Sequence, residues 1–356
     1  MSSCARSPES SDVMLELLAW ALLILVLLRA LVSLEQIYSL LRPDAPSPPP
    51  LSGVPRVLLR KAALTLKGAV YLVLSRDKVS SSALRRTIDP AELEPSRVTR
   101  EVRLIFVRHG ESVWNLVFNR GFGPSFLWRL LSTLLHELLL VPVDDSAFLD
   151  SPLSPLGLQQ CGQLATFLAQ PCVEGEVAER DHRALTTPGG ALLVSSQLRR
   201  AVGTLGLALR SRLAASDEPV LLHSSLQEIS RNFDTQSLAS AGGVPPLDTP
   251  LRMDGAINAG NKSLSFTGLR RLQDFVQWAA ARQEPVVVVG GHSLWFRSFF
   301  QLYLPRDSDH PGKTRKIVNC GAVGLTLQVG RTAVGEVVHR IDPESINVVY
   351  GGFSAK

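Results

Sequence analysis

An apolar run over residues 104–107 stops abruptly at Arg108 and His109, and this feature constrains the fold more than any other. The run predicts a strand over residues 102–107 that is buried on both faces of a parallel sheet. Open α/β sheets bind their ligands at the carboxyl ends of their strands. We therefore expect the His109 imidazole to face a substrate and not the core.

The same arrangement occurs twice more along the chain. Residues 191–194 are apolar and are followed closely by Arg199 and Arg200, and the four valines 286–289 run through two glycines into His292. Three predicted strands therefore deliver cationic or imidazole side chains to what should be the same edge of one sheet.

Predicted strands alternate with predicted helices over most of the chain. The strands are expected at 102–107, 191–195, 219–222, 285–289 and 323–328, and the helices at 153–169, 198–213, 263–283 and 293–302. This alternation predicts a three-layer α/β/α sandwich with a mainly parallel sheet. Residues 334–341 are expected to add an edge strand, and the tail beyond them is expected to be peripheral.

Five motifs follow one another in order between residues 102 and 326: RHGESVWN, DSPLSPLG, SSQLRRAVGT, LQE and GGHS. In this order they resemble the histidine phosphatase superfamily, also called phosphoglycerate-mutase-like, and in particular its branch of cofactor-dependent mutases and small phosphatases. The resemblance implies transfer of a phosphoryl group through a phosphohistidine, a reaction that needs positioning and charge stabilisation.

The resemblance also implies roles for individual residues. His109 would be the nucleophile and must be neutral to attack phosphorus. Arg108 and Arg200 would hold phosphate oxygens with bidentate donors, and His292 would add a further donor. Asn115, at the family's Trp-Asn position, would contribute a neutral amide to the same oxygens.

A leaving alkoxide needs a proton, and in this branch a glutamate supplies it. Glu228 matches that residue and would also deprotonate the attacking water. The text after Glu228 departs from the family, which often continues with glycine and aromatic residues. Glu111 and Asp234 therefore remain alternatives for the acid.

These assignments predict an enzyme, a phosphomonoester hydrolase that acts on a phosphorylated small molecule or a phosphoprotein. The alternatives are a mutase-type phosphotransferase and a phosphate-binding scaffold with weak catalysis. The mutases' tryptophan-rich continuation after the Trp-Asn motif is missing, which favours the hydrolase. No cofactor or metal is expected, because the four cysteines lack zinc-ligand spacing; they are Cys4, Cys161, Cys172 and Cys320.

Residues 1–35 are predicted to be an N-terminal membrane anchor. The stretch 13–34 just reaches the length that a spanning helix needs, with Glu16 and Arg29 near its ends. Positive charge follows the stretch, which predicts a single-pass protein with its catalytic domain on the cytoplasmic side. A mitochondrial membrane is an alternative location.

Residues 36–100 are predicted to be a linker ahead of a phosphatase domain at 101–345. Prolines over 42–50 favour an extended spacer, and 57–75 is predicted to be a basic, apolar helix on an anionic bilayer surface. Thirteen Lys and Arg against seven acids between Arg29 and Arg103 favour a membrane partner, whereas the shortage of aromatics excludes nucleic acid.

An insertion at 116–149 separates the first two motifs. Within it, residues 126–140 are predicted to form an amphipathic helix that borders the mouth of the site. Packing on the core, a lid, a membrane-dipping element and a dimer face are its alternative roles, and the sequence leaves a homodimer open.

Overall fold

A computed structural model describes residues 53–171, 175–248 and 250–355, together with Ala19, Trp20, Leu22 and Arg29. Its centre is a sheet with the strand order β4-β3-β2-β5-β1-β6-β7. The first five strands in this order run parallel, whereas β6 is antiparallel to β1 and β7 is antiparallel to β6. The strands are β1 (Val98–Arg108), β2 (Leu192–Ser195), β3 (Val220–Leu222), β4 (Met253–Asp254), β5 (Val286–Gly291), β6 (Ala322–Arg331) and β7 (Val337–Tyr350).

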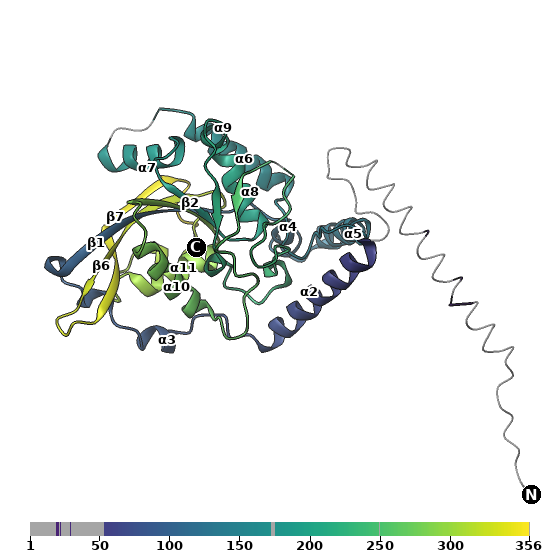
Figure 1. Ribbon diagram of the computed structural model, residues 1–356, viewed down its shortest axis with the longest axis horizontal. Helices are drawn as coiled ribbons and strands as arrows, with labels where there is room; N and C mark the ends of the chain where they lie inside the picture. Colours follow the sequence, from purple (N-terminus) through teal and green to yellow (C-terminus); the bar gives the residue numbers. More distant parts are fainter. Residues whose placement is uncertain are drawn as a thin grey trace, which may run out of the picture.

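Helices cover both faces of the sheet (Figure 1). On one face α10 (Gly268–Ala280) and α11 (Ser293–Tyr303) pack on alternate residues of β1 and β5. The other residues of these strands pack on the opposite side against α6 (Pro155–Leu168), α7 (Glu176–Thr186), α8 (Arg199–Ala208) and α9 (Arg210–Ala214). The central strands are therefore apolar on both faces, as in a parallel sheet with helices on each side.

The predicted α/β class, the mostly parallel sheet and the helices on both sides are confirmed. The sequence missed three helices and a strand: α3 (Ser81–Arg85), α4 (Val113–Phe118), α7 and β4. It also missed the length of β7, which pairs with β6 over most of residues 337–350 and is not a peripheral tail.

The predicted single-pass membrane protein is contradicted. Among the residues that the structure describes, no helix combines the length and the apolarity needed to cross a bilayer. The stretch proposed as the span, residues 13–34, lies outside the described residues apart from Ala19, Trp20, Leu22 and Arg29. The Pro-rich spacer at 42–50 also lies outside them.

Part of the predicted linker packs on the domain. Helix α2 (Val54–Leu74) is the helix expected at 57–75, but two of its basic side chains bind the protein itself. Lys61 Nζ donates to the carbonyls of Leu140 and Asp145 at 2.9 and 2.7 Å, and Arg60 bonds to Asp144. Within residues 53–97, α2 is therefore attached to the rest of the protein through these side chains, and the short helix α3 (Ser81–Arg85) lies between α2 and β1 in the chain (Figure 1).

The predicted insertion helix is present as α5 (Pro124–Leu139). Its leucine stripe does not pack on the core: Leu127 is 67% exposed and Leu135 is 57% exposed, and Thr133 is the residue of α5 that is buried. The turn after α5 forms a small cluster of its own, from Leu140, Val143 and Ala147. Packing on the core is therefore not what the amphipathic pattern of α5 encodes.

Candidate active site

The sheet places the predicted site residues at adjacent strand ends. Strand β1 pairs with β5 so that Arg108 lies opposite Gly291, and the His109 amide donates to the Gly291 carbonyl at 3.0 Å. His292 follows directly, and its ring centroid lies 5.1 Å from that of His109. Strand β2, on the other side of β5, leads into α8 and Arg200.

These strand ends open into a cavity of about 170 Å³. His109, Arg108, Arg200, Glu228 and Asn115 line it, and His292 is fully buried beside His109. The remaining lining residues are Trp114, Asn119, Ser230, Asn232, Asp234, Thr235, Ser293, Leu294 and Lys316. All six residues predicted from the motifs are therefore brought to one place.

His109 is held in the form that a nucleophile needs. Its Nδ1 lies 2.6 Å from the Gly110 carbonyl, and because a carbonyl oxygen only accepts, the proton is on Nδ1 and the Nε2 lone pair is free. Burial lowers the pKa of His109 well below its usual value, and the charges of Arg200 and Arg108 lower it further. The imidazole is therefore neutral near pH 7.

His292 is also neutral but lacks partners. Burial lowers its pKa well below the usual value, and Arg200 is the next cause. Neither ring nitrogen forms a hydrogen bond with any described residue. An unpartnered buried polar group costs about 1–3 kcal/mol, so the His292 ring keeps hydrogen-bonding capacity that no described residue satisfies.

Arg108 and Arg200 each bind the protein through one side of the guanidinium. Arg108 Nη1 donates to the Ile317 carbonyl at 2.6 Å. Arg200 Nη1 donates to the Asp234 carbonyl at 2.7 Å, and its Nη2 lies 3.1 Å from Asp234 Oδ2. The Nε of each arginine is buried and unpartnered among the described residues. Burial lowers the pKa of Arg108 to about 10, so this side chain is cationic near pH 7.

Three carboxylates were candidates for the acid, and the structure separates them. Glu111 does not line the cavity: Arg120 binds it at 2.8 Å, and Ser154 donates to it at 2.7 Å. Asp234 lines the cavity and pairs with Arg200. Burial raises the pKa of Asp234, and the Arg200 charge opposes that rise.

Glu228 is held by two backbone amides at the cavity wall. Its Oε1 accepts from Ile229 N at 2.9 Å and from Trp295 N, in the first turn of α11, at 3.0 Å. Among the described residues, Oε2 accepts no hydrogen bond. One carboxyl oxygen is thus fixed in place, and the other has no partner among the described residues.

The sequence missed Lys316, which lines the cavity and adds a cation to it. Burial lowers the pKa of Lys316, and Arg108 lowers it further. Asn319, from the same loop, donates to the His109 carbonyl at 3.0 Å. No motif identifies this loop, but it directly precedes β6, whose antiparallel direction places it at the carboxyl end of β1.

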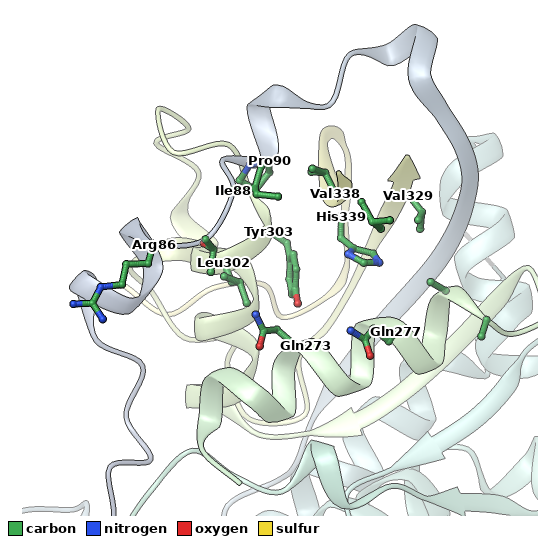
Figure 2. A pocket seen from close by; sticks show the side chains of 14 residues that line it. Arg86, Ile88, Pro90, Gln273, Gln277, Leu302, Tyr303, Val329, Val338 and His339 are labelled. Atoms are coloured by element: carbon green, nitrogen blue, oxygen red, sulfur yellow. The ribbon is translucent and has the colours of Figure 1, made fainter. Parts of the chain in front are cut away.

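A larger cavity lies elsewhere and contains none of the predicted residues. It has a volume of about 720 Å³ and lies between α10, α11, β7 and the segment before β1. Figure 2 shows Gln273 and Gln277 of α10 together with Tyr303 and His339 around it. Its lining includes one cation, Arg86, and no carboxylate, so it lacks the charges that phosphate chemistry requires.

Within the described ranges, no three His, Cys, Asp or Glu side chains gather as they would around a metal ion. No family model matches the chain, and no curated protein matches it.

Solved structures similar to this chain include a mycobacterial hydrolase, with 16% identity over 72% of this chain and 100% of the other and a TM-score of 0.34. A mycobacterial glucosyl-3-phosphoglycerate phosphatase complexed with VO3 has 18% identity over 68% of this chain and 97% of the other, with a TM-score of 0.35. An ecdysone phosphate phosphatase from Bombix mori in complex with tungstate has 15% identity over 72% and 97%, with a TM-score of 0.35. By name these are phosphatases and a hydrolase. Likenesses at these identities and TM-scores do not establish an activity, so the function depends on the site itself.

Proposed function

We propose that this chain is a phosphomonoesterase of the histidine phosphatase type. One observation carries the proposal: a neutral histidine with a free Nε2 lies beside three buried donor groups that have no partner among the described residues, on Arg108, Arg200 and His292. A phosphoryl group has the charge and the oxygens that satisfy these donors. Several other buried arginine Nε atoms, such as those of Arg271 and Arg340, also lack a partner among the described residues, so the support comes from the convergence of these groups beside His109 at one cavity.

In the first half of the reaction, His109 Nε2 attacks phosphorus and the bond to the substrate oxygen breaks. Arg108, Arg200 and the His292 ring stabilise the charge on the phosphoryl oxygens. Glu228 gives its proton to the leaving alkoxide, so the departing group leaves as an alcohol.

In the second half, water attacks the phosphohistidine. Glu228 takes the proton of that water, the N–P bond breaks, and inorganic phosphate leaves with His109 neutral again. The Asn115 amide, at the same cavity wall, would donate to the phosphoryl oxygens throughout. The substrate would be a phosphorylated small molecule or a phosphoprotein whose body extends outside the cavity.

The test is hydrolysis of p-nitrophenyl phosphate and of an alkyl phosphate by the full-length protein, with His109→Ala as the matched control. We expect turnover by the wild-type protein and a loss of at least about 10³-fold in the variant, because the residual arrangement still binds phosphate but has no nucleophile. Equal rates for the two proteins would refute the proposal that this chain is a phosphatase that uses His109. Phosphate binding with no turnover by the wild-type protein would identify a scaffold.

A further inference from the structure

A fully buried ion cluster lies next to the cavity. Lys262 Nζ is 2.9 Å from Asp77 Oδ2, and Arg271 Nη1 is 2.8 Å from Asp77 Oδ1. All three side chains have no exposed area. One carboxylate therefore serves two buried cations, and breaking such a pair from one side leaves charges without compensation.

The two cations also hold the chain segment that carries Glu228. Lys262 Nζ donates to the carbonyls of Glu228 and Ser230, at 2.6 Å each, and Arg271 Nη2 lies 3.4 Å from the Glu228 carbonyl. Glu228 and Ser230 both line the cavity. The ammonium group of Lys262 thus bridges Asp77 and the backbone of the cavity wall.

Asp77 comes from the segment between α2 and α3, far in sequence from the motifs. Its carbonyl accepts from Gly268 N at 3.2 Å, and a Cβ on Gly268 would lie 2.4 Å from that carbonyl oxygen. The Tyr71 ring of α2 lies 4.8 Å from Lys262 Nζ. The contact with the start of α10 is close, and only glycine fits at its centre.

Charge within the cluster depends on Asp77. Burial lowers the pKa of Lys262 to about 8, and Asp77 is the largest influence that opposes this. Burial pushes the pKa of Asp77 up, but Lys262 and Arg271 together outweigh burial and hold it below its usual value. Without the carboxylate, the ammonium would lose the group that keeps it charged and in place.

We propose that Asp77 is a positioning residue of the active site, which acts through Lys262 and Arg271 to hold the Glu228 segment against the cavity. This assignment rests on the proposed function, and in particular on Glu228 as the proton donor. The segment before β1 would then complete the site and would not be a tether for it.

The test compares Asp77→Asn with the wild-type full-length protein on two substrates. An alkyl phosphate releases an alkoxide, which is a poor leaving group and needs the Glu228 proton. In contrast, p-nitrophenyl phosphate releases p-nitrophenolate, a stabilised anion that needs this proton little. We expect kcat/KM for the alkyl phosphate to fall about tenfold or more beyond any fall for p-nitrophenyl phosphate, because kcat/KM reports formation of the phosphohistidine. A partly unfolded protein would lose both activities equally.

Asp89→Asn is the matched control, since Asp89 lies in the same segment, pairs with Arg306 at the surface and should leave both rates unchanged. Lys262→Met should reproduce the selective loss, and the double variant Asp77→Asn, Lys262→Met should lose less than the sum of the two effects.

Equal losses on the two substrates, or no loss beyond that of Asp89→Asn, would overturn the assignment of Asp77. Absence of any hydrolysis by the wild-type protein would instead overturn the proposed function, and the assignment with it.

Discussion

Arg199 and Arg200 are consecutive residues of one type with different surroundings. Successive residues on α8 point in directions about 100° apart, so they meet different neighbours. Arg200 faces the cavity and Asp234. Arg199 is buried against the 145–150 turn. Its guanidinium donates to the Asp145 side chain and to the Asp150 and Ser146 carbonyls. One arginine is available to a ligand, and the other is occupied by structure.

This difference predicts opposite outcomes for the same substitution. Arg200→Lys keeps the charge but loses the fork and the Nε donor, so kcat/KM should fall by about 10²-fold or more with a smaller effect on stability. Arg199→Lys should lower the free energy of unfolding more than it lowers kcat/KM. Steady-state kinetics and denaturant unfolding of both variants measure this, and the reverse pattern would show that the two roles are exchanged.

At the scale of elements, the direction of β6 decides part of the site. Ala322, at the start of β6, pairs with Val107, at the end of β1, because the two strands are antiparallel. The loop 316–321 therefore lies at the carboxyl end of β1 and supplies Lys316 to the cavity. In a parallel strand the preceding loop would lie at the opposite edge of the sheet.

The start of α6 packs directly on the loop that follows His109. A Cβ on Gly157 would lie 2.1 Å from the Glu111 carbonyl oxygen, and Ser154 N donates to that same oxygen at 2.8 Å. The backbones of the first two motifs are therefore in contact, and a side chain at this position would push them apart.

Gly157→Ala should lower the free energy of unfolding by about 1–3 kcal/mol, because backbone atoms must shift to admit the methyl group. It should also reduce activity, since the displaced loop adjoins His109. Gly162→Ala is the control on the same helix: nothing lies within 4 Å of its Cβ, so stability should be unchanged or higher by up to about 1 kcal/mol. Chemical unfolding of both variants decides, and equal stabilities would contradict the close contact.

At the scale of the whole molecule, buried histidines make stability depend on pH. Burial lowers the pKa of His109 and His292 well below their usual value and lowers that of His223 to about 4. The unfolded chain takes up these protons below about pH 6.5 and the folded protein does not. The stability is therefore complete above that pH and is lost as the pH falls toward the folded-state pKa values.

Each such histidine should cost up to about 1.4 kcal/mol of unfolding free energy per pH unit below 6.5. His223→Asn should reduce the slope by about that amount, because asparagine does not titrate and can still accept from the Ser225 amide that His223 binds at 3.2 Å. Denaturant unfolding at about pH 7.5 and about pH 5.5 provides the slopes. An unchanged slope in the variant would mean that His223 does not contribute.

The sequence by itself determined the sheet class and the positions of His109, Arg108, Arg200 and His292. Each of these residues follows an apolar strand within a few positions, and strands buried on both faces must lie in the middle of the sheet with their ends at one edge. These positions depend on residues that are close together in the sequence, so the amino-acid sequence alone is enough to predict them.

Only the tertiary structure decided the rest. It placed Lys316 through the direction of β6, and it distinguished Glu228 from Glu111 by their partners. It joined Asp77 to Lys262, which lies 185 residues away. Ion pairs and loop positions of this kind depend on which surfaces meet in space, and no periodicity or spacing along the chain records that.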